Sequence, residues 1–177
     1  MATRQNSSSG QVLERELVIT RILDAPRERV FRAWAEPERA RRWWGPKGFT
    51  TPYCEIDFRP GGVYHNCMRS PEGRDYWSVG VYREIVEPER IVCTDSFSDE
   101  QGNIVPATYY GMSEDMLTEM LVAVTFEDYQ GRTRLTLHHI GIPPGEDMEG
   151  AREGWSQSFD KLAEYLLAES LADEEEE

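Results

Sequence analysis

Residues 146–171 read EDMEGAREGWSQSFDKLAEYLLAESL, and this stretch decides the fold. Its large apolar side chains recur at intervals of three, four and seven residues, which is the spacing of one face of an α-helix. The residues of that stripe are Met148, Trp155, Phe159, Leu162 and Leu166. Acidic residues open the stretch and favour a helix start there, because the N-terminal end of the helix dipole is positive. The pattern predicts one long helix over residues 148–171, roughly 36 Å from end to end.

Gly150 and Gly154 lie four residues apart on this helix and share one of its faces. Each glycine inside a helix costs roughly 1 kcal/mol relative to alanine. We interpret the pair as a place where a loop or strand approaches the helix closely; the alternative is that the glycines leave room for a ligand.

The chain before this helix is divided into short segments by proline and glycine turns. Apolar and polar residues alternate in most of these segments, which is typical of strands joined as hairpins. The predicted strands are residues 16–25, 53–58, 63–69, 76–86, 91–97, 120–129 and 133–140. Two short helices follow the first strand, one with Val30, Phe31 and Trp34 on one face and one that begins at Pro37. Residues 103–119 form a long connection, which in a compact domain is usually functional or mobile.

The order of these elements predicts an α+β fold. Strands do not alternate with helices along the chain, which argues against a parallel doubly wound sheet. One long helix cannot cover a flat sheet of six to seven strands, so the antiparallel sheet has to curl around it while the two short helices close one end. Curled sheets of this kind tend to leave an interior space, and such spaces are common small-molecule sites.

The charge of the chain excludes some classes of partner. The formal charge is −14, from 33 acidic and 19 basic residues, and five of the acids form the run 173–177, so the remainder carries about −9 (−14 + 5). An acidic body repels phosphate backbones and anionic lipid headgroups over about 8 Å at physiological salt. We therefore expect neither nucleic acid nor a membrane surface as a partner.

The sequence also carries information about where the protein is located in the cell. No segment reaches the roughly 20 apolar residues of a membrane span, and the N-terminus lacks the apolar core of a signal peptide. The three cysteines, Cys54, Cys67 and Cys93, are widely spaced and form no CxxC pair, which indicates reduced thiols. We expect a cytoplasmic protein with residues 1–11 disordered, one folded domain over residues 12–171, and an acidic disordered tail at 172–177.

Several short motifs, in this order, resemble the START-like (SRPBCC) superfamily. They are Arg59-Pro-Gly-Gly62, Pro71-Glu-Gly73, Gly80-Val-Tyr-Arg-Glu-Ile85 with Pro88-Glu-Arg-Ile91, Thr133-Arg-Leu-Thr-Leu137, and Gly154-Trp155 leading to Leu162. Within it, residues 14–168 are similar to the family named for the C-terminal domain of the activator of the heat-shock chaperone ATPase. The resemblance implies the helix-grip fold. It does not imply one function, because relatives bind lipids, hormones or polyketides, a few are enzymes, and the name-giving members stimulate a chaperone.

Catalytic and metal signatures are weak in this sequence. A nucleophile elbow, an HExxH motif and a phosphate loop are all missing. A metal site would need His139 to meet His65, Cys67 or Cys54 on one face, which the spacing does not favour, so we expect no metal and no cofactor. His139 could instead be an inward polar group, with Glu84 or Asp95 as an acid or base beside it if buried.

The aromatic side chains give the best indication of function. We expect a non-catalytic protein that holds a small hydrophobic or aromatic molecule between the sheet and the long helix, its entrance between Trp43-Trp44 and the loop around Tyr109-Tyr110. On the third predicted strand Tyr64, Asn66 and Met68 are chosen as inward, with Val63, His65 and Cys67 as the rival set. The candidate cavity residues are Trp43, Trp44, Tyr64, Asn66, Met68, Trp77, Tyr82, Tyr110, Val124, His139, Trp155 and Phe159.

Two other functions remain open at this point. One is a chaperone-associated protein of the stress response, as the family name suggests, acting through its surface. The other is a small cyclase or hydrolase acting on a hydrophobic substrate. The sequence does not decide whether the chain forms a homodimer.

Overall fold

The computed structural model describes residues 15–176 and places seven strands in one antiparallel sheet. Along the sheet the order is β1-β7-β6-β5-β4-β3-β2, so β1 and β2 form the two edges. The strands are β1 (Glu16–Leu23), β2 (Thr50–Ile56), β3 (Val63–Arg69), β4 (Asp75–Val86), β5 (Arg90–Ser98), β6 (Met120–Tyr129) and β7 (Arg132–Ile140). They match the predicted strands apart from small shifts at their ends, and the α+β prediction is confirmed. The predicted disorder of residues 1–11 lies outside the described residues.

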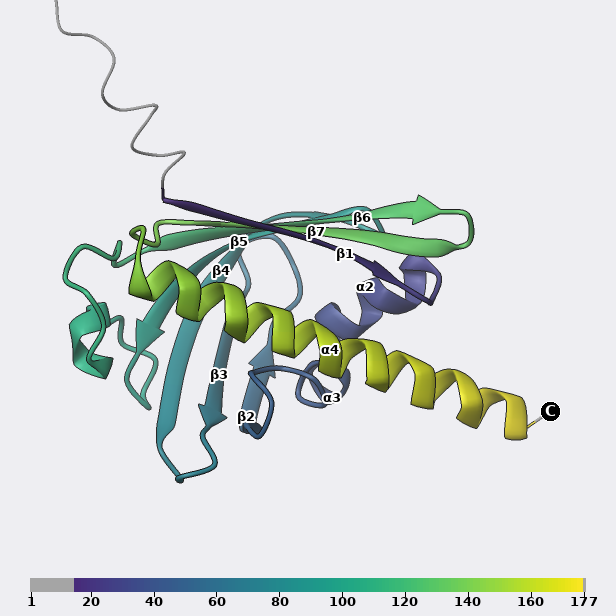
Figure 1. Cartoon of the computed structure of the whole chain (residues 1–177), viewed down its shortest axis with the longest axis horizontal. Helices are drawn as coiled ribbons and strands as arrows, with labels where there is room; N and C mark the ends of the chain where they lie inside the picture. The colour runs from purple at the N-terminus through teal and green to yellow at the C-terminus, as the bar shows by residue number, and fades with distance from the viewer. Residues whose placement is uncertain (1–14, 177) are drawn as a thin grey trace, which may run out of the picture.

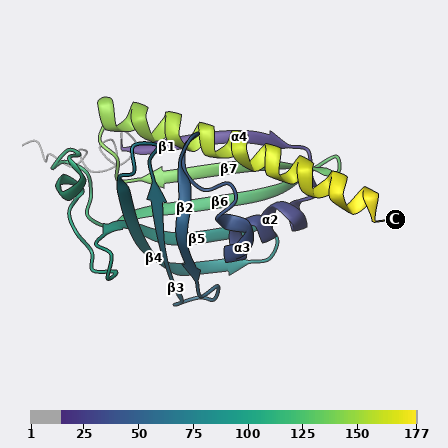
Figure 2. The same ribbon diagram turned by 90° about the horizontal axis from the view of Figure 1, so that it is seen from below.

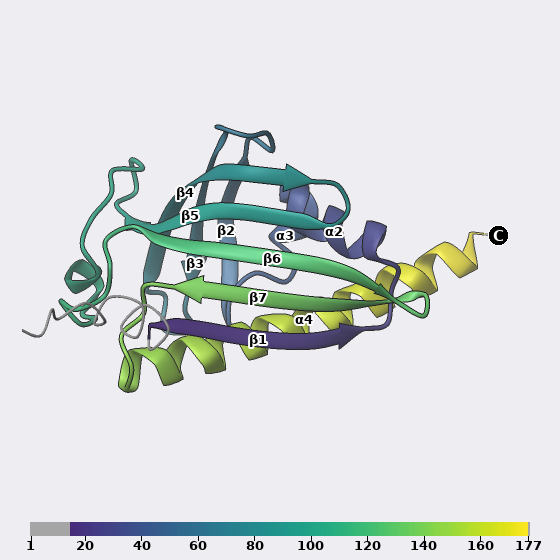
Figure 3. The same cartoon turned by 90° about the horizontal axis from the view of Figure 1, so that it is seen from above.

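The helices occupy only one side of the sheet. They are α2 (Arg27–Ala35), α3 (Pro37–Ala40), the 3-10 helix η1 (Ala107–Tyr110) and α4 (Glu146–Glu175). α4 crosses the concave face of the curled sheet, and α2 and α3 close one end beneath it (Figure 1, Figure 2). In the described part of the chain no helix lies over the convex face of β1, β7 and β6 (Figure 3). None of the described helices is long and apolar enough to cross a membrane.

Alternation along the strands decides which side chains face α4. On β1, Leu17 is fully buried whereas its neighbour Val18 is 44% exposed. Val124 of β6 lies opposite Leu137 of β7, and both point into the core. The helix meets them with its apolar stripe, whose buried members include Phe159, Leu162 and Leu166. Burial of each such side chain contributes about 1.5–3 kcal/mol, which is why the stripe fixes the position of the helix.

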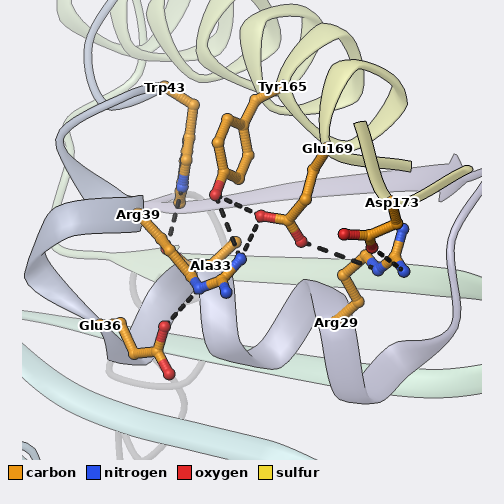
Figure 4. Close-up of polar contacts among 8 residues, drawn as sticks. All are labelled: Arg29, Ala33, Glu36, Arg39, Trp43, Tyr165, Glu169 and Asp173. Atoms are coloured by element: carbon orange, nitrogen blue, oxygen red, sulfur yellow. Dashed lines mark hydrogen bonds and ion pairs between the residues drawn. The ribbon is translucent and has the colours of Figure 1, made fainter. Parts of the chain in front are cut away.

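The C-terminal end of α4 differs from the sequence prediction. The helix continues to Glu175, whereas the sequence predicts a disordered acidic tail from residue 172. The reason is a set of ion pairs between α4 and the short helices (Figure 4). Glu169 pairs with both Arg29 and Arg39, and Asp173 Oδ2 lies 3.1 Å from Arg29 Nη2. These cations offset the unfavourable placement of acids at the negative end of the helix dipole.

The long connection of residues 103–119 is packed against the opposite end of α4. It contains η1, and the Tyr110 hydroxyl of η1 accepts a hydrogen bond from the Trp77 amide at 3.0 Å and donates one to the Ser98 carbonyl. A second, smaller apolar cluster forms there from Leu17, Ala107, Met116, Met120, Ile142 and Met148. The connection therefore belongs to the packed end of the domain.

The two helical glycines are in different surroundings. A Cβ added to Gly150 would meet nothing within 4 Å, so the expected close approach is wrong there. A Cβ added to Gly154 would lie 3.6 Å from Pro46 Cγ, an ordinary contact with the segment between α3 and β2.

We predict that Gly150→Ala stabilises the protein by about 0.5–1 kcal/mol, because alanine loses less backbone entropy than glycine in a helix and meets no neighbour here. Urea denaturation followed by circular dichroism measures the change. Gly141→Ala is the matched control and should be destabilising, since Gly141 has φ 117° and an added Cβ would lie 2.9 Å from Met120 Cγ. Equal effects of the two substitutions would contradict this explanation.

Candidate functional site

A small cavity lies between the sheet and α4, at the end closed by α2 and α3. Its volume is about 50 Å³, enough for one or two water molecules. Side chains from both long layers and from both short helices line it, and most of them are apolar or aromatic. The lining residues are Trp34, Ala40, Trp44, Cys54, Ile56, Tyr64, Asn66, Tyr82, Ile91, Cys93, Asp95, Val122, Val124 and Trp155.

One wall of the cavity is polar. The Tyr64 hydroxyl lies 2.9 Å from Asp95 Oδ1 and 3.0 Å from the Thr94 carbonyl, so it donates to acceptors on β5. Burial, together with the negative charge of Asp95, holds the pKa of Tyr64 well above its usual range, so the phenol keeps its proton. Next to it the buried Asn66 pairs its side-chain oxygen with the Ser78 hydroxyl. These groups could bind a polar atom of a ligand.

His139 contacts the Asp95 side of this wall. Its side chain is buried, and its Nδ1 accepts a hydrogen bond from Trp155 Nε1 at 3.0 Å. A nitrogen that accepts in this way carries no proton, so we assign the neutral tautomer with the proton on Nε2. Nε2 lies 3.3 Å from Asp95 Oδ2, close enough for attraction but without a well-aligned hydrogen bond. His139 thus links α4 to Asp95 through Trp155.

Three tryptophans form the opposite wall. Trp34 of α2 stacks on Trp155 of α4 with ring centroids 6.0 Å apart, and Trp44 meets Trp155 edge-on at 5.4 Å. Trp34 Nε1 is buried and finds no hydrogen-bond partner among residues 15–176. A buried N–H without a partner loses the hydrogen bond it made to water, typically at a cost of 1–3 kcal/mol. Aromatic contacts thus hold this wall together, while one of its N–H groups lacks a hydrogen-bond partner in the described part of the chain.

The cavity also contains two thiols, Cys54 and Cys93. Burial raises the pKa of Cys54 to about 11, partly offset by Arg41, and burial together with Asp95 raises that of Cys93. Cys67 lies outside the cavity, and burial raises its pKa to about 11 as well. All three are protonated at neutral pH and are poor nucleophiles.

We predict that Cys54 and Cys67 react with iodoacetamide at pH 8 roughly a hundredfold more slowly in the folded protein than in urea, because the thiolate is the reactive form. Peptide mass spectrometry after timed alkylation gives the rate at each cysteine. Rates within a few-fold of the unfolded chain would show that burial does not suppress the thiolates.

Six of the twelve candidate residues line the cavity: Trp44, Tyr64, Asn66, Tyr82, Val124 and Trp155. The choice of inward face on β3 is thus right for Tyr64 and Asn66, while Met68 lies beside Gly45 and does not line the cavity. Trp43 and Phe159 are fully buried in the core, where Trp43 Nε1 donates to the Ala33 carbonyl at 3.0 Å.

Two candidate residues, Trp77 and Tyr110, lie away from the cavity, and the position of Tyr110 affects the predicted entrance. Trp77 contacts the rings of Tyr53 and His65, on the face of the sheet opposite Tyr82. The physical reason is parity: residues 77 and 82 are an odd number apart, so one regular strand points them to opposite sides. Tyr110 packs on Phe97 at the far end of the domain, so the expected entrance beside Tyr110 is wrong.

The cavity is also lined by residues that the sequence did not single out for it, among them Trp34 and Cys93. It is lined too by Asp95, which the sequence suggested only as an acid or base beside His139. The sequence places Trp34 on the apolar face of a short helix. Whether that side chain reaches the cavity depends on how α2 packs against the sheet and α4, which the sequence does not show. Cys93 and Asp95 occupy alternate positions of β5 and share one face. The intervening residues Val92, Thr94 and Ser96 are buried on the other face. Alternation therefore does not show which of the two faces points into the cavity.

A metal site is not assembled from the described residues. Among residues 15–176 no group of three or more histidine, cysteine or acidic side chains converges. His65 lies beside Trp77 with its Nε2 3.4 Å from the Asp99 carbonyl, on the opposite face of the sheet from the cavity.

The comparisons with known proteins agree with the fold. A family model described as "Activator of Hsp90 ATPase homolog 1-like protein" matches residues 24–167. The chain belongs to this family. Solved structures of similar fold include a Chromobacterium violaceum protein, 29% identical with a TM-score of 0.72 over 86% of this chain and 96% of that one.

Two further structures extend the comparison. A Nitrosomonas europaea protein is 26% identical with a TM-score of 0.73 over 89% of this chain and 97% of that one. A Silicibacter pomeroyi protein that bears the abbreviated family name is 25% identical with a TM-score of 0.66 over 87% and 99%. A search among curated proteins finds no match. The activator of Hsp90 ATPase homolog 1-like family thus agrees with the helix-grip fold of the structure and with the START-like resemblance of the sequence.

Proposed function

We propose that the protein is a non-catalytic binding protein for a small apolar or aromatic molecule, held between the sheet and α4. The observation that supports it is the cavity itself: aromatic and aliphatic walls with a few converging polar groups, Tyr64, Asn66 and Asp95. This combination is the usual composition of a small-molecule site, in which the apolar walls give affinity and the polar groups give orientation.

Ligand binding requires the cavity to enlarge. Its 50 Å³ is well below the roughly 300 Å³ at which ligand pockets begin. The segment from Trp44 to Phe49 is the wall best suited to move, because it has no helix or strand of its own and contains Gly45 and Gly48 at positive φ. Lys161 Nζ of α4 fastens it by donating to the carbonyls of Trp44, Gly45, Pro46 and Phe49, at 3.1–3.4 Å.

A thermal-shift panel of small apolar and aromatic compounds, followed by native mass spectrometry, tests the proposal. A compound at a hundred times its dissociation constant stabilises the folded state by about 2.7 kcal/mol, which raises Tm by roughly 5–10 °C in a domain of this size. Cys93→Leu, which fills the cavity, should abolish the shift.

Tryptophan fluorescence locates the ligand. In a Trp44→Phe variant the ligand-induced change should shrink, whereas Trp77→Phe, on the opposite face of the sheet, should retain it. If no compound binds, or if binding survives Cys93→Leu unchanged, the cavity is not the site.

The second candidate is a small enzyme, and the pairing of buried His139 with Asp95 favours it. Its weakness is that Trp155 occupies Nδ1 and Asp95 faces Nε2, so neither nitrogen is free to take a proton from a substrate. An assay against hydrophobic esters decides between the two: turnover that disappears in His139→Gln would support the enzyme. Ligand affinity that persists in that variant would support the binding protein.

A further inference from the structure

A second hollow lies on the surface and is lined by residues from α3 and the turn after it, from the start of β2 and from α4; Figure 2 shows how these elements are arranged. Its volume is about 460 Å³ and it is open to solvent. The residues around it are Glu38, Arg41, Arg42, Phe49, Thr50, Thr51, Pro52 and Lys161.

The hollow is cationic in a protein that is otherwise strongly acidic. Three basic side chains and one acidic side chain line it, a local charge of +2 (3 − 1), while the whole chain carries −14. Among residues 15–176, no carboxylate lies within ion-pair distance of Arg41, Arg42 or Lys161, although arginines elsewhere are paired, as in Arg69 with Asp75. Unpaired cations gathered in one hollow attract an anion.

The three cations differ in how their donors are used. Arg42 is exposed, and its guanidinium makes no hydrogen bond within the described chain. Arg41 Nη2 donates to the carbonyls of Thr51 and Pro52, at 3.4 and 3.1 Å, which leaves its other donors available. Lys161 donates only to carbonyls, and burial lowers the pKa of its ammonium group. An anion nearby would stabilise that desolvated charge.

The Trp44–Phe49 segment borders both spaces, since Trp44 lines the cavity and Phe49 lines the hollow. Trp44 places its ring in the cavity wall, and its carbonyl accepts hydrogen bonds from Thr51 Oγ1 and Lys161 Nζ, both at 3.2 Å and both from residues that line the hollow. Movement of the Trp44–Phe49 segment would therefore join the two spaces. A molecule in the enlarged cavity would reach the hollow with one end.

The polar wall of the cavity determines which end of such a molecule points inward. Asp95 is the acidic group on that wall, and its carboxylate disfavours a second anion in a space with little water. An acidic ligand would be repelled by the inner end and attracted by the cations outside.

We propose that this hollow binds the anionic head group of the cavity ligand, so that the ligand is an amphiphilic acid: an apolar or aromatic body in the cavity and a carboxylate or phosphate against Arg41 and Arg42. This assignment rests on the proposed function and narrows its ligand class. Arg41 and Arg42 select the charge, and the tryptophan wall selects the body.

Titration calorimetry with decanoate, decyl phosphate and 1-decanol tests the assignment, because the three probes share one chain and differ in the head group. We expect the wild-type protein to bind the better of the two acids about two- to fivefold more tightly than decanol, the effect of one partly exposed ion pair. Whichever acid binds more tightly identifies carboxylate or phosphate as the head group. In Arg42→Gln, and more completely in Arg41→Gln/Arg42→Gln, the preference for the acid should fall while decanol affinity stays the same.

Arg152→Gln is the matched control, since Arg152 is exposed on α4 and removing it changes the net charge equally. It should keep the wild-type preference. Decanol bound as tightly as both acids, or a preference that survives in Arg42→Gln, would overturn the head-group assignment alone. If none of the three probes binds, the proposed function fails and the assignment fails with it.

Discussion

Gly80→Ala should destabilise the protein by about 3 kcal/mol or more, the upper range for overpacking a filled interior. Gly80 lies in β4 where the ring of Tyr64 crosses it. An added Cβ would lie 2.1 Å from the Thr94 carbonyl oxygen and 2.3 Å from Tyr64 Cε1. Because the carbonyl belongs to the neighbouring strand β5, the clash can be relieved only by separating two paired strands or by displacing the tyrosine from the cavity wall. Urea denaturation followed by circular dichroism measures the loss.

The matched control is Gly154→Ala, whose added Cβ would lie 3.6 Å from Pro46 Cγ. That variant should be as stable as the wild type or slightly more stable, because the contact is ordinary and alanine favours the helix. A Gly80→Ala protein within about 0.5 kcal/mol of the wild type would contradict the packing described for β4 and Tyr64.

Glu169→Ala should cost about 2 kcal/mol, the second largest effect expected here. The side chain of Glu169 is only 17% exposed. It accepts hydrogen bonds from Arg39 and the Tyr165 hydroxyl and forms an ion pair with Arg29 (Figure 4). Removing it leaves two partly buried guanidinium groups without this carboxylate. Loss of one partner of a fully buried pair costs 3–5 kcal/mol, and the partial exposure of these arginines reduces that figure.

Thermal unfolding of the variant, together with the helical signal at 222 nm, measures the effect. Part of the helical signal should disappear before the main transition, because the C-terminal turns of α4 lose their contacts with α2 and α3. Glu174→Gln removes a charge from an exposed side chain of the same helix and should leave Tm unchanged. A Tm in Glu169→Ala equal to that of the control would show that the ion pairs contribute nothing.

Much of the architecture was predictable, because it depends on local pattern. The apolar stripe around Phe159 and Leu162 defines a helix wherever it occurs, and strands separated by turns have few ways to pair. On β3 Tyr64 and Asn66 do line the cavity, but the sequence left Val63, His65 and Cys67 open as the rival set, because both sets mix polar and apolar residues and Cys67 is itself fully buried.

The cavity was only half predictable, for reasons that concern distant parts of the chain. Trp77 and Tyr82 looked equivalent as aromatic residues, and only strict alternation along β4 separates them. The position of Tyr110 depends on how η1 packs against the sheet, and the periodicity of the sequence does not show that packing. The end of α4 was misjudged because the partners of Glu169 lie on α2 and α3, far away in the sequence.

The pairing of the first strand with the last has a consequence for the order of folding. Glu16 lies opposite Ile140 in the β1–β7 pair, 124 positions further along the chain (140 − 16). During synthesis at roughly 5–20 residues per second, β1 waits about 6–25 s for its neighbour, and the stripe of α4 emerges later still. Contacts of such large sequence separation slow folding. We therefore expect the hairpins β2–β5 to form first and the closure of β1 onto β7 to limit the rate.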